Sequence, residues 1–157
     1  MLVRRYQNTD FDQMMQLHRE VLQKENVYRG AGVWEDDLQN IDDHYFNRDG
    51  YFIVGIEDEK IIAMGAYRKL MNGMAEIVRM RVHHDFQGKG YGYIILSELE
   101  KIAVQFNFKE LVLETDERLL NAIRLYERNG YAFWKQEEMH GYRCIWYKKP
   151  LSMATSN

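Results

Sequence analysis

The sequence predicts a single α/β (α+β) domain, with a central mixed sheet of about seven strands flanked by about four helices on both faces. Runs with strand composition alternate with amphipathic runs of helical spacing along the chain. One strand–loop–helix–strand unit is also long enough to join two parallel neighbours. A length of 157 residues suits one domain. We expect residues 1–150 to form it and residues 151–157 to be a frayed tail.

The first predicted elements are a short strand and two helical stretches. The strand covers residues 2–7, and apolar residues from Phe11 to Leu22 then recur at near-helical spacing. The pattern breaks over residues 26–32 and resumes over residues 34–46. A helical hairpin is therefore expected before the main part of the sheet.

Three antiparallel strands are predicted next. Residues 51–56 and 61–67 are rich in β-branched and aromatic side chains and are separated by a polar turn. Asn72-Gly73 is typical of a tight hairpin turn, after which residues 74–82 form the third strand.

The second half contains the parallel crossover. A helix is expected from about Tyr91 to Phe106, and an apolar strand follows over residues 110–115, parallel to strand 74–82. A further helix from Leu119 to Asn129 ends at Gly130. Two last strands, 131–139 and 142–149, are expected to pair around His140-Gly141.

Composition limits the partners and the compartment. With 46% hydrophobic and 29% charged residues the chain has a globular composition, and its net charge of −3 gives no reason to expect nucleic-acid binding. The one cysteine, Cys144, cannot form an internal disulfide and lies in an apolar run, so a buried structural thiol is expected. With no signal-peptide pattern or membrane-length apolar run, the expected location is the cytoplasm.

The segment Gln87-Gly88-Lys89-Gly90-Tyr91-Gly92 predicts a pyrophosphate site. Glycines at a strand-to-helix turn let backbone N–H groups approach an anion, and the helix start adds unpaired donors. Two nucleotide motifs do not fit. The P-loop needs a glycine where His83 stands, and the dinucleotide motif G-x-G-x-x-G needs one where Tyr93 stands.

The motif that fits is R/Q-x-x-G-x-G/A, matched by Gln87, Gly90 and Gly92. Downstream, the segment from Asn121 to Tyr131 resembles N-x-x-A/A-x-x-L-Y-x-x-x-G-F/Y. Together these motifs identify a resemblance to the GNAT superfamily of N-acetyltransferases that extends over nearly the whole chain. The chain departs from the family pattern where glutamine replaces the commoner arginine at the start of the motif, and where no proline precedes it.

The resemblance implies acetyl-CoA as the donor substrate. The strand segment Met80, Arg81 and Val82 would pair with the pantetheine arm, and an amide near Met80 would polarise the thioester carbonyl. The main-chain amides of the glycine loop would hold the pyrophosphate. The residues expected at the donor site are Met80, Arg81, Val82, Gln87, Gly88, Lys89, Gly90, Tyr91, Gly92, Asn121 and Tyr126. Asn121 is either a contact of this kind or a helix N-terminal cap, and the cap is the simpler interpretation.

Two residues are candidates for proton transfer. By resemblance Tyr126 would protonate the leaving thiolate, because a phenol stays protonated at neutral pH; the alternative is a core aromatic on an amphipathic helix. Because Ala75-Glu76-Ile77-Val78 resembles the strand of histone-type members of the superfamily, Glu76 would by resemblance be the general base for the acceptor amine. Partial burial between apolar neighbours would raise its pKa toward a useful value. The alternative for Glu76 is a solvated residue on the polar face of its strand.

The acceptor pocket is predicted only by resemblance, from the first helices and the last hairpin. Tyr28, Trp34 and Tyr67 are its leading candidates, and aromatic rings with carboxylates suit a cationic amine. Further candidates are Glu35, Asp36, Asp37 and Trp134. Each of these also fits ordinary core or solvated surface. His83-His84 have no ligand at metal-binding spacing, so no metal site is expected.

The leading hypothesis is therefore an acetyl-CoA-dependent N-acetyltransferase that acts on a primary amine by direct transfer in a ternary complex. The alternative is a non-catalytic acyl-CoA-binding or regulatory module with the same fold, and a nucleotide-binding protein is a third class. A homodimer is an expected state by analogy with the family, although the sequence indicates no interface. The sequence leaves the identity of the amine open.

Overall fold

The computed structural model describes residues 1–139 and 141–152, so His140 of the predicted hairpin turn and most of the predicted tail lie outside the described residues. The described strands form one sheet in the order β1-β2-β3-β4-β5-β7-β6. Their bounds are β1 Leu2–Arg5, β2 Tyr51–Glu57, β3 Lys60–Met71, β4 Met74–Val82, β5 Glu110–Asp116, β6 Ala132–Met139 and β7 Tyr142–Pro150. The predicted α/β domain with a seven-stranded mixed sheet is confirmed.

Only one strand pair in the described part of the sheet is parallel. β4 and β5 pair in parallel from Met74 opposite Glu110 to Ile77 opposite Leu113. All other neighbours run antiparallel. The helix between β4 and β5 is the crossover that the sequence predicts.

Five α-helices lie in the described residues, one more than predicted. They are α1 Phe11–Lys24, α2 Asp36–Gln39, α3 Ile41–His44, α4 Tyr91–Gln105 and α5 Leu120–Arg128. The extra helix arises because the helical stretch predicted over residues 34–46 is interrupted at Asn40, which has an extended φ of −147°. The Asn40 side chain accepts a hydrogen bond from the Asp43 N–H at 3.1 Å, so it starts a new helix instead of continuing the old one.

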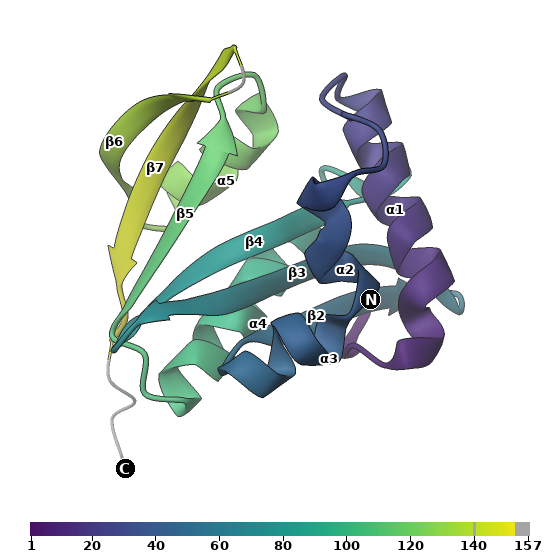
Figure 1. Ribbon diagram of the computed structural model, residues 1–157, viewed down its shortest axis with the longest axis horizontal. Coiled ribbons are helices and arrows are strands. Elements are labelled where there is room, and N and C mark those ends of the chain that lie inside the picture. The colour runs from purple at the N-terminus through teal and green to yellow at the C-terminus, as the bar shows by residue number, and fades with distance from the viewer. Residues whose placement is uncertain (140, 153–157) are drawn as a thin grey trace.

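The helices cover both faces of the sheet and create two core layers (Figure 1). On one face α1, α2 and α3 pack on β2 and β3 through residues such as Met14, Leu38 and Phe52. On the other face α4 and α5 pack through residues such as Leu99 and Tyr126. The sheet is thus buried on both sides, which accounts for the apolar runs of its central strands.

No helix in the described residues combines the length and apolar character that a bilayer crossing requires.

Candidate active site

The sheet opens between β4 and β5. The two strands are paired only as far as Ile77 and Leu113, although β4 continues to Val82 and β5 to Asp116. Beyond this point β5 stays paired with β7, as far as Asp116 opposite Cys144, and β4 stays with β3. Figure 1 shows the resulting divergence of β4 from β5. The backbone edge of β4 that faces the opening is therefore free of a partner strand among the described residues.

A bulge in β4 shapes this edge. Met64 pairs with Arg81 and Ala66 with Val78, so Gly65 faces two residues, Arg79 and Met80. Arg79 adopts a left-handed φ of +60°. Such a backbone conformation costs about 1–3 kcal/mol for a residue with a side chain and is typical of functional sites. Gly65 leaves room for the bulge, because a Cβ there would lie 2.8 Å from the Met80 sulfur.

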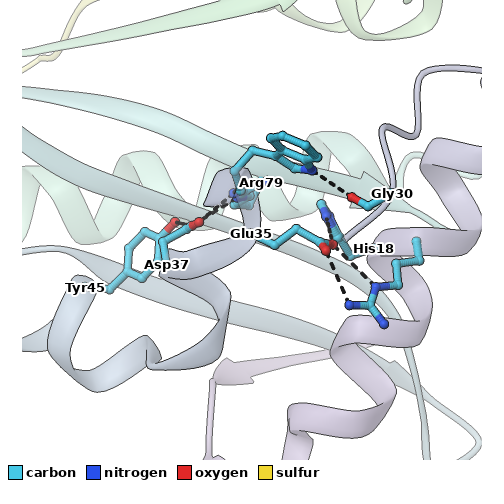
Figure 2. Close-up of polar contacts among 8 residues, drawn as sticks. His18, Gly30, Glu35, Asp37, Tyr45 and Arg79 are labelled. Atoms are coloured by element: carbon cyan, nitrogen blue, oxygen red, sulfur yellow. Dashed lines mark hydrogen bonds and ion pairs between the residues drawn. The ribbon is translucent and has the colours of Figure 1, made fainter. Parts of the chain in front are cut away.

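Polar contacts of Arg79 hold the bulge in place (Figure 2). Its Nη2 donates to Asp37 Oδ1 at 2.6 Å and its Nε to Asp37 Oδ2 at 3.1 Å. The Tyr45 hydroxyl donates to the same carboxylate, and Arg79 also donates to the Trp34 carbonyl. Although burial acts to raise it, the bonds from Arg79 hold the pKa of Asp37 below its usual value. The short helices α2 and α3 are thereby tied to β4.

The glycine loop forms the wall of a cavity of about 730 Å³, which we name the donor cavity. Gly88 and Gly90 have φ of +79° and +82°, and a Cβ at either would meet nothing within 4 Å. These glycines are needed for backbone conformation and not for space. The first helical bond of α4 runs from the Ile94 N–H to the Gly90 carbonyl, so the preceding amides of α4 have no partner within the helix. A curved row of amides at the start of a 15-residue helix fits a pyrophosphate.

The other loop residues behave differently from one another. Gln87 donates from Nε2 to the Val82 carbonyl at 3.1 Å, so it fixes the loop to the end of β4. Gly92 allows close approach of α5, since a Cβ there would lie 3.2 Å from a Leu125 methyl group. Lys89 does not line the donor cavity, and its ammonium lies 5.1 Å from the centre of the Phe86 ring.

Asn121 lines the donor cavity and does not cap its helix. The N-cap of α5 is Leu119, which gives no side-chain capping bond, and Asn121 is the second residue of the helix. The capping interpretation of Asn121 is therefore wrong, because the helix starts one residue before it. Met80, Arg81 and Val82 line the same cavity along the free edge of β4.

A second cavity of about 600 Å³, the acceptor cavity, lies on the other side of this edge. Its walls come from α1, the segment from the end of α1 through α2 and α3, strands β3, β4, β5 and β7, and α5. Of the residues expected to contact the acceptor, it is lined by Tyr28, Trp34, Asp36 and Asp37, together with the base candidate Glu76.

Three of the other acceptor candidates lie elsewhere. Tyr67 is 1% exposed and packs in the core against Phe108, so the prediction that it contacts the acceptor is not supported by its position. Trp134 lies on the exposed strand β6 and packs edge-on against Trp146. Glu35 is buried below the cavity, where its carboxylate lies 3.1 Å from His18 Nε2 (Figure 2).

Glu76 is buried and ion-paired. One carboxylate oxygen, Oε1, accepts from Arg68 Nε at 3.2 Å and from Arg68 Nη2 at 2.9 Å. Its exposed fraction is 3%. The position is neither a solvated strand face nor that of a free carboxylate, because Arg68 holds one of the two carboxylate oxygens.

Glu114 on β5 is a further carboxylate in the acceptor cavity that sequence reasoning missed. Its Oε2 is buried and has no hydrogen-bond partner among the described residues. Burial, and then the charge of Glu76, raise the pKa of its carboxyl group. An acid in a strand, directly after the apolar run from Leu111 to Leu113, is the same kind of signal that drew attention to Glu76, and it could have found this residue.

Cys144 lies beside Glu114 in the acceptor cavity. Burial, and then the charge of Glu114, raise the pKa of its thiol to about 11. A thiol that stays protonated is a poor nucleophile, which agrees with the expected structural role.

Tyr126 on α5 lines both cavities and is 5% exposed. Burial raises its pKa to about 12, against an opposing effect of the Arg81 charge. Of the two catalytic candidates, Tyr126 therefore lies at the junction of the cavities, whereas Glu76 lines the acceptor cavity alone. The residues that line both are Leu22, Met80, Arg81, Leu119, Ala122 and Tyr126. A donor and an acceptor can react only where their cavities meet, so this junction is the candidate reaction centre.

His83, His84 and Asp85 bring ligand atoms within 4.8 Å of one another just before the glycine loop. The two imidazoles stack with ring centres 4.2 Å apart and planes 25° apart. Because the two rings are stacked and nearly parallel, the in-plane lone pairs of their nitrogens do not converge on one point. His83 Nδ1 also already accepts a hydrogen bond from the Asp85 N–H. The cluster therefore has poor geometry for a shared ion.

Comparisons with known proteins agree with this geometry. The family model of the GNAT acetyltransferases matches residues 11–131. A GNAT acetyltransferase from Staphylococcus aureus Mu50 superposes with a TM-score of 0.87 at 18% identity, covering 96% of this chain and 99% of the other. The ribosomal-protein-S18-alanine N-acetyltransferase from Escherichia coli gives 0.79 at 17% identity over 99% and 97%.

A third similar structure, the PaiA N-acetyltransferase from Thermoplasma acidophilum, was solved in complex with coenzyme A. It gives a TM-score of 0.75 at 18% identity over 95% of this chain and 98% of the other. A comparison with curated protein sequences found no match. At these identities the solved structures show the shared fold, whereas the family model covers most of the chain. The chain therefore belongs to the GNAT family of acetyltransferases.

Proposed function

We propose that the protein transfers the acetyl group of acetyl-CoA to a primary amine of a small molecule or peptide, by direct attack in a ternary complex. The observation that carries the proposal is the junction of the donor and acceptor cavities at Met80, Arg81 and Tyr126. Both substrates can reach this point at once, so no acetylated enzyme residue is needed. The coenzyme A bound to one similar structure supports the choice of donor.

The glycine loop and the free edge of β4 hold the donor in this mechanism. The amides at the start of α4 bind the pyrophosphate, and the β4 edge beyond Ile77 pairs with the pantetheine arm as an added strand would. An amide of the β4 edge near Met80 then polarises the thioester carbonyl.

Glu114 receives the proton that the acceptor amine loses, directly or through one water. Its side chain lines the acceptor cavity, and its raised pKa brings it nearer to the working range of a general base. Glu76 serves this step electrostatically, since its charge is one cause of the raised pKa of Glu114. Tyr126, which lines both cavities, gives a proton to the departing sulfur.

Two measurements on the purified protein test the proposal. Acetyl-CoA should raise the unfolding temperature by several degrees at concentrations far above its dissociation constant. A panel of primary amines should then include at least one that releases free thiol from acetyl-CoA. Stabilisation without thiol release from any amine would favour the non-catalytic acyl-CoA-binding module, and the lack of stabilisation at millimolar acetyl-CoA would contradict both.

A further inference from the structure

Arg81 has an unusual position among the arginines of the site. It lines both cavities, next to Tyr126. The neighbouring arginines Arg68 and Arg79 each form an ion pair, with Glu76 and Asp37. Among the described residues no carboxylate lies within ion-pair distance of Arg81, whose Nη1 donates to the carbonyl of the preceding residue at 2.7 Å. Its buried Nε has no hydrogen-bond partner there.

A partly buried guanidinium without a counter-ion, whose Nε is shielded from solvent, is costly and needs an explanation. Burial, and then the charge of Arg79, lower the pKa of Arg81 to about 10, which still leaves it charged at neutral pH. The groups whose charges act on Arg81 come from several elements and include Glu25, Tyr45, Arg79 and Tyr126. The charge of Arg81 also lowers the pKa of His18 on α1. The junction therefore carries a positive charge that no carboxylate among the described residues neutralises by direct contact, and a further negative charge would be stabilised there.

The acetyl transfer generates such a charge at this place. When the amine nitrogen bonds to the carbonyl carbon and the carbon–sulfur bond breaks, the electron pair of that bond goes to the sulfur. Tyr126 is a weak acid for this thiolate, because its pKa is about 12. Against a reference thiol pKa of about 8.5, proton transfer from it is unfavourable by roughly three orders of magnitude. A cation beside the sulfur removes the need for an early proton.

We propose that Arg81 is a catalytic residue, whose guanidinium contacts the sulfur of coenzyme A at the junction and stabilises the thiolate as the carbon–sulfur bond breaks. The inference rests on the proposed function. The amine proton goes to Glu114, the electron pair stays on the sulfur beside Arg81, and the thiolate is protonated last, by a proton that passes from solvent through Tyr126. This role differs from the backbone contact expected for residue 81 by family resemblance, because it belongs to the side chain.

The test measures the pKa of the coenzyme A thiol while it is bound, from the ultraviolet absorbance of the thiolate across a pH series. Coenzyme A itself is the probe, so the acceptor need not be known. The spectrum of the protein alone is subtracted, because Cys144 and the tyrosines also titrate. In the wild-type complex the thiol pKa should lie at least about one unit below that of free coenzyme A.

Three variants make the result specific. Arg81→Gln should raise the pKa of the bound thiol by about one unit or more, a tenfold loss of thiolate at fixed pH. Arg81→Lys should keep most of the lowering. Arg124→Gln removes an arginine that lines only the donor cavity, and should leave the thiol pKa unchanged even if coenzyme A binds more weakly.

The outcomes separate this inference from the proposed function. If calorimetry shows no coenzyme A binding to the wild-type protein, both fail. If coenzyme A binds but its thiol pKa in the wild-type complex equals or exceeds that of free coenzyme A, the role of Arg81 is overturned and the proposed function stands. The role of Arg81 is overturned in the same way if Arg81→Gln binds coenzyme A with a thiol pKa equal to that of the wild-type complex. The wild-type measurement decides the question even if a variant does not fold.

Discussion

The donor and acceptor cavities share a wall, but main-chain groups form the first and side chains form the second. The donor cavity depends on main chain: two glycines in left-handed conformation, the first turn of α4 and the free edge of β4. The acceptor cavity depends on side chains between His18 and Cys144 that are fixed by ion pairs such as Arg79 with Asp37. A backbone cradle suits a donor that never changes, whereas a side-chain wall can be altered for a different amine without rebuilding the fold.

Separate replacements of Glu76 and Glu114, two of the carboxylates that line the acceptor cavity, should give the largest effect on catalysis. Glu114→Gln should lower kcat by about 100-fold or more, because it removes the proposed proton acceptor. Glu76→Gln should cost about tenfold or less, since Glu76 is occupied by Arg68 and acts through its charge. Steady-state kinetics with the best amine of the panel measures both. A larger loss of kcat in Glu76→Gln than in Glu114→Gln would reverse the assignment.

Asp37→Asn tests whether side-chain ion pairs hold the acceptor wall. It leaves the Arg79 guanidinium without its counter-ion, which should lower the free energy of unfolding by about 2 kcal/mol. The loss is smaller than for a fully buried ion pair because both partners are partly exposed. The KM for the amine should rise while the affinity for acetyl-CoA stays near wild type. Asp36→Asn, an exposed neighbour, should change stability by less than about 0.5 kcal/mol. Equal unfolding free energies for the two variants would remove the support role of Asp37.

Gly90→Ala tests the backbone cradle on the donor side. The left-handed conformation at Gly90 costs a residue with a Cβ about 1–2 kcal/mol, so acetyl-CoA affinity should fall by about tenfold if the loop relaxes. Gly73→Ala is the matched control, because Gly73 has a φ of +78° in a turn that lines neither cavity. It should lose similar stability with no loss of affinity by titration calorimetry. Unchanged affinity in Gly90→Ala would mean that the loop conformation is not part of the binding site.

The pH dependence of stability probes the buried layer below the acceptor wall. Burial, and then the charges of Arg81 and Arg79, lower the pKa of His18 to about 3. The unfolded chain binds this proton below about pH 6.5 and the folded chain does not, so stability should fall as the pH decreases from 6.5. The expected loss is about 1 kcal/mol between pH 6.5 and 5.5. In His18→Gln, denaturant titrations over this range should give a flatter profile, and an equal slope would contradict the buried neutral imidazole.

The same difference between the cavities explains how far the sequence could be read. The donor loop is contiguous, and its glycines at Gly88 and Gly90 carry their backbone requirement in their identity, so a pyrophosphate site was predictable there. The parallel crossover was predictable from the length of the connection between residues 82 and 110, whereas the place of β7 between β5 and β6 was not predicted.

The acceptor side was harder because its walls are assembled by tertiary contacts. Tyr67 lies on β3 and packs in the core layer that α4 covers. An aromatic residue suits a pocket wall and a core equally well, so its residue type did not show which of the two positions it takes. Arg81 acquires its importance only from a missing partner among the described residues, a property that depends on residues distant in sequence. The helix predicted over residues 34–46 is interrupted because Asn40 bonds the local backbone, a competition that apolar spacing does not show.

A crystal structure of the protein with coenzyme A would locate both ends of the donor relative to the two cavities. We expect the pyrophosphate on the amides between Gly88 and Gly92, and the sulfur at the junction in contact with Arg81 and Tyr126. A pyrophosphate bound away from the start of α4, or a sulfur distant from both side chains, would contradict the proposed donor site and reaction centre.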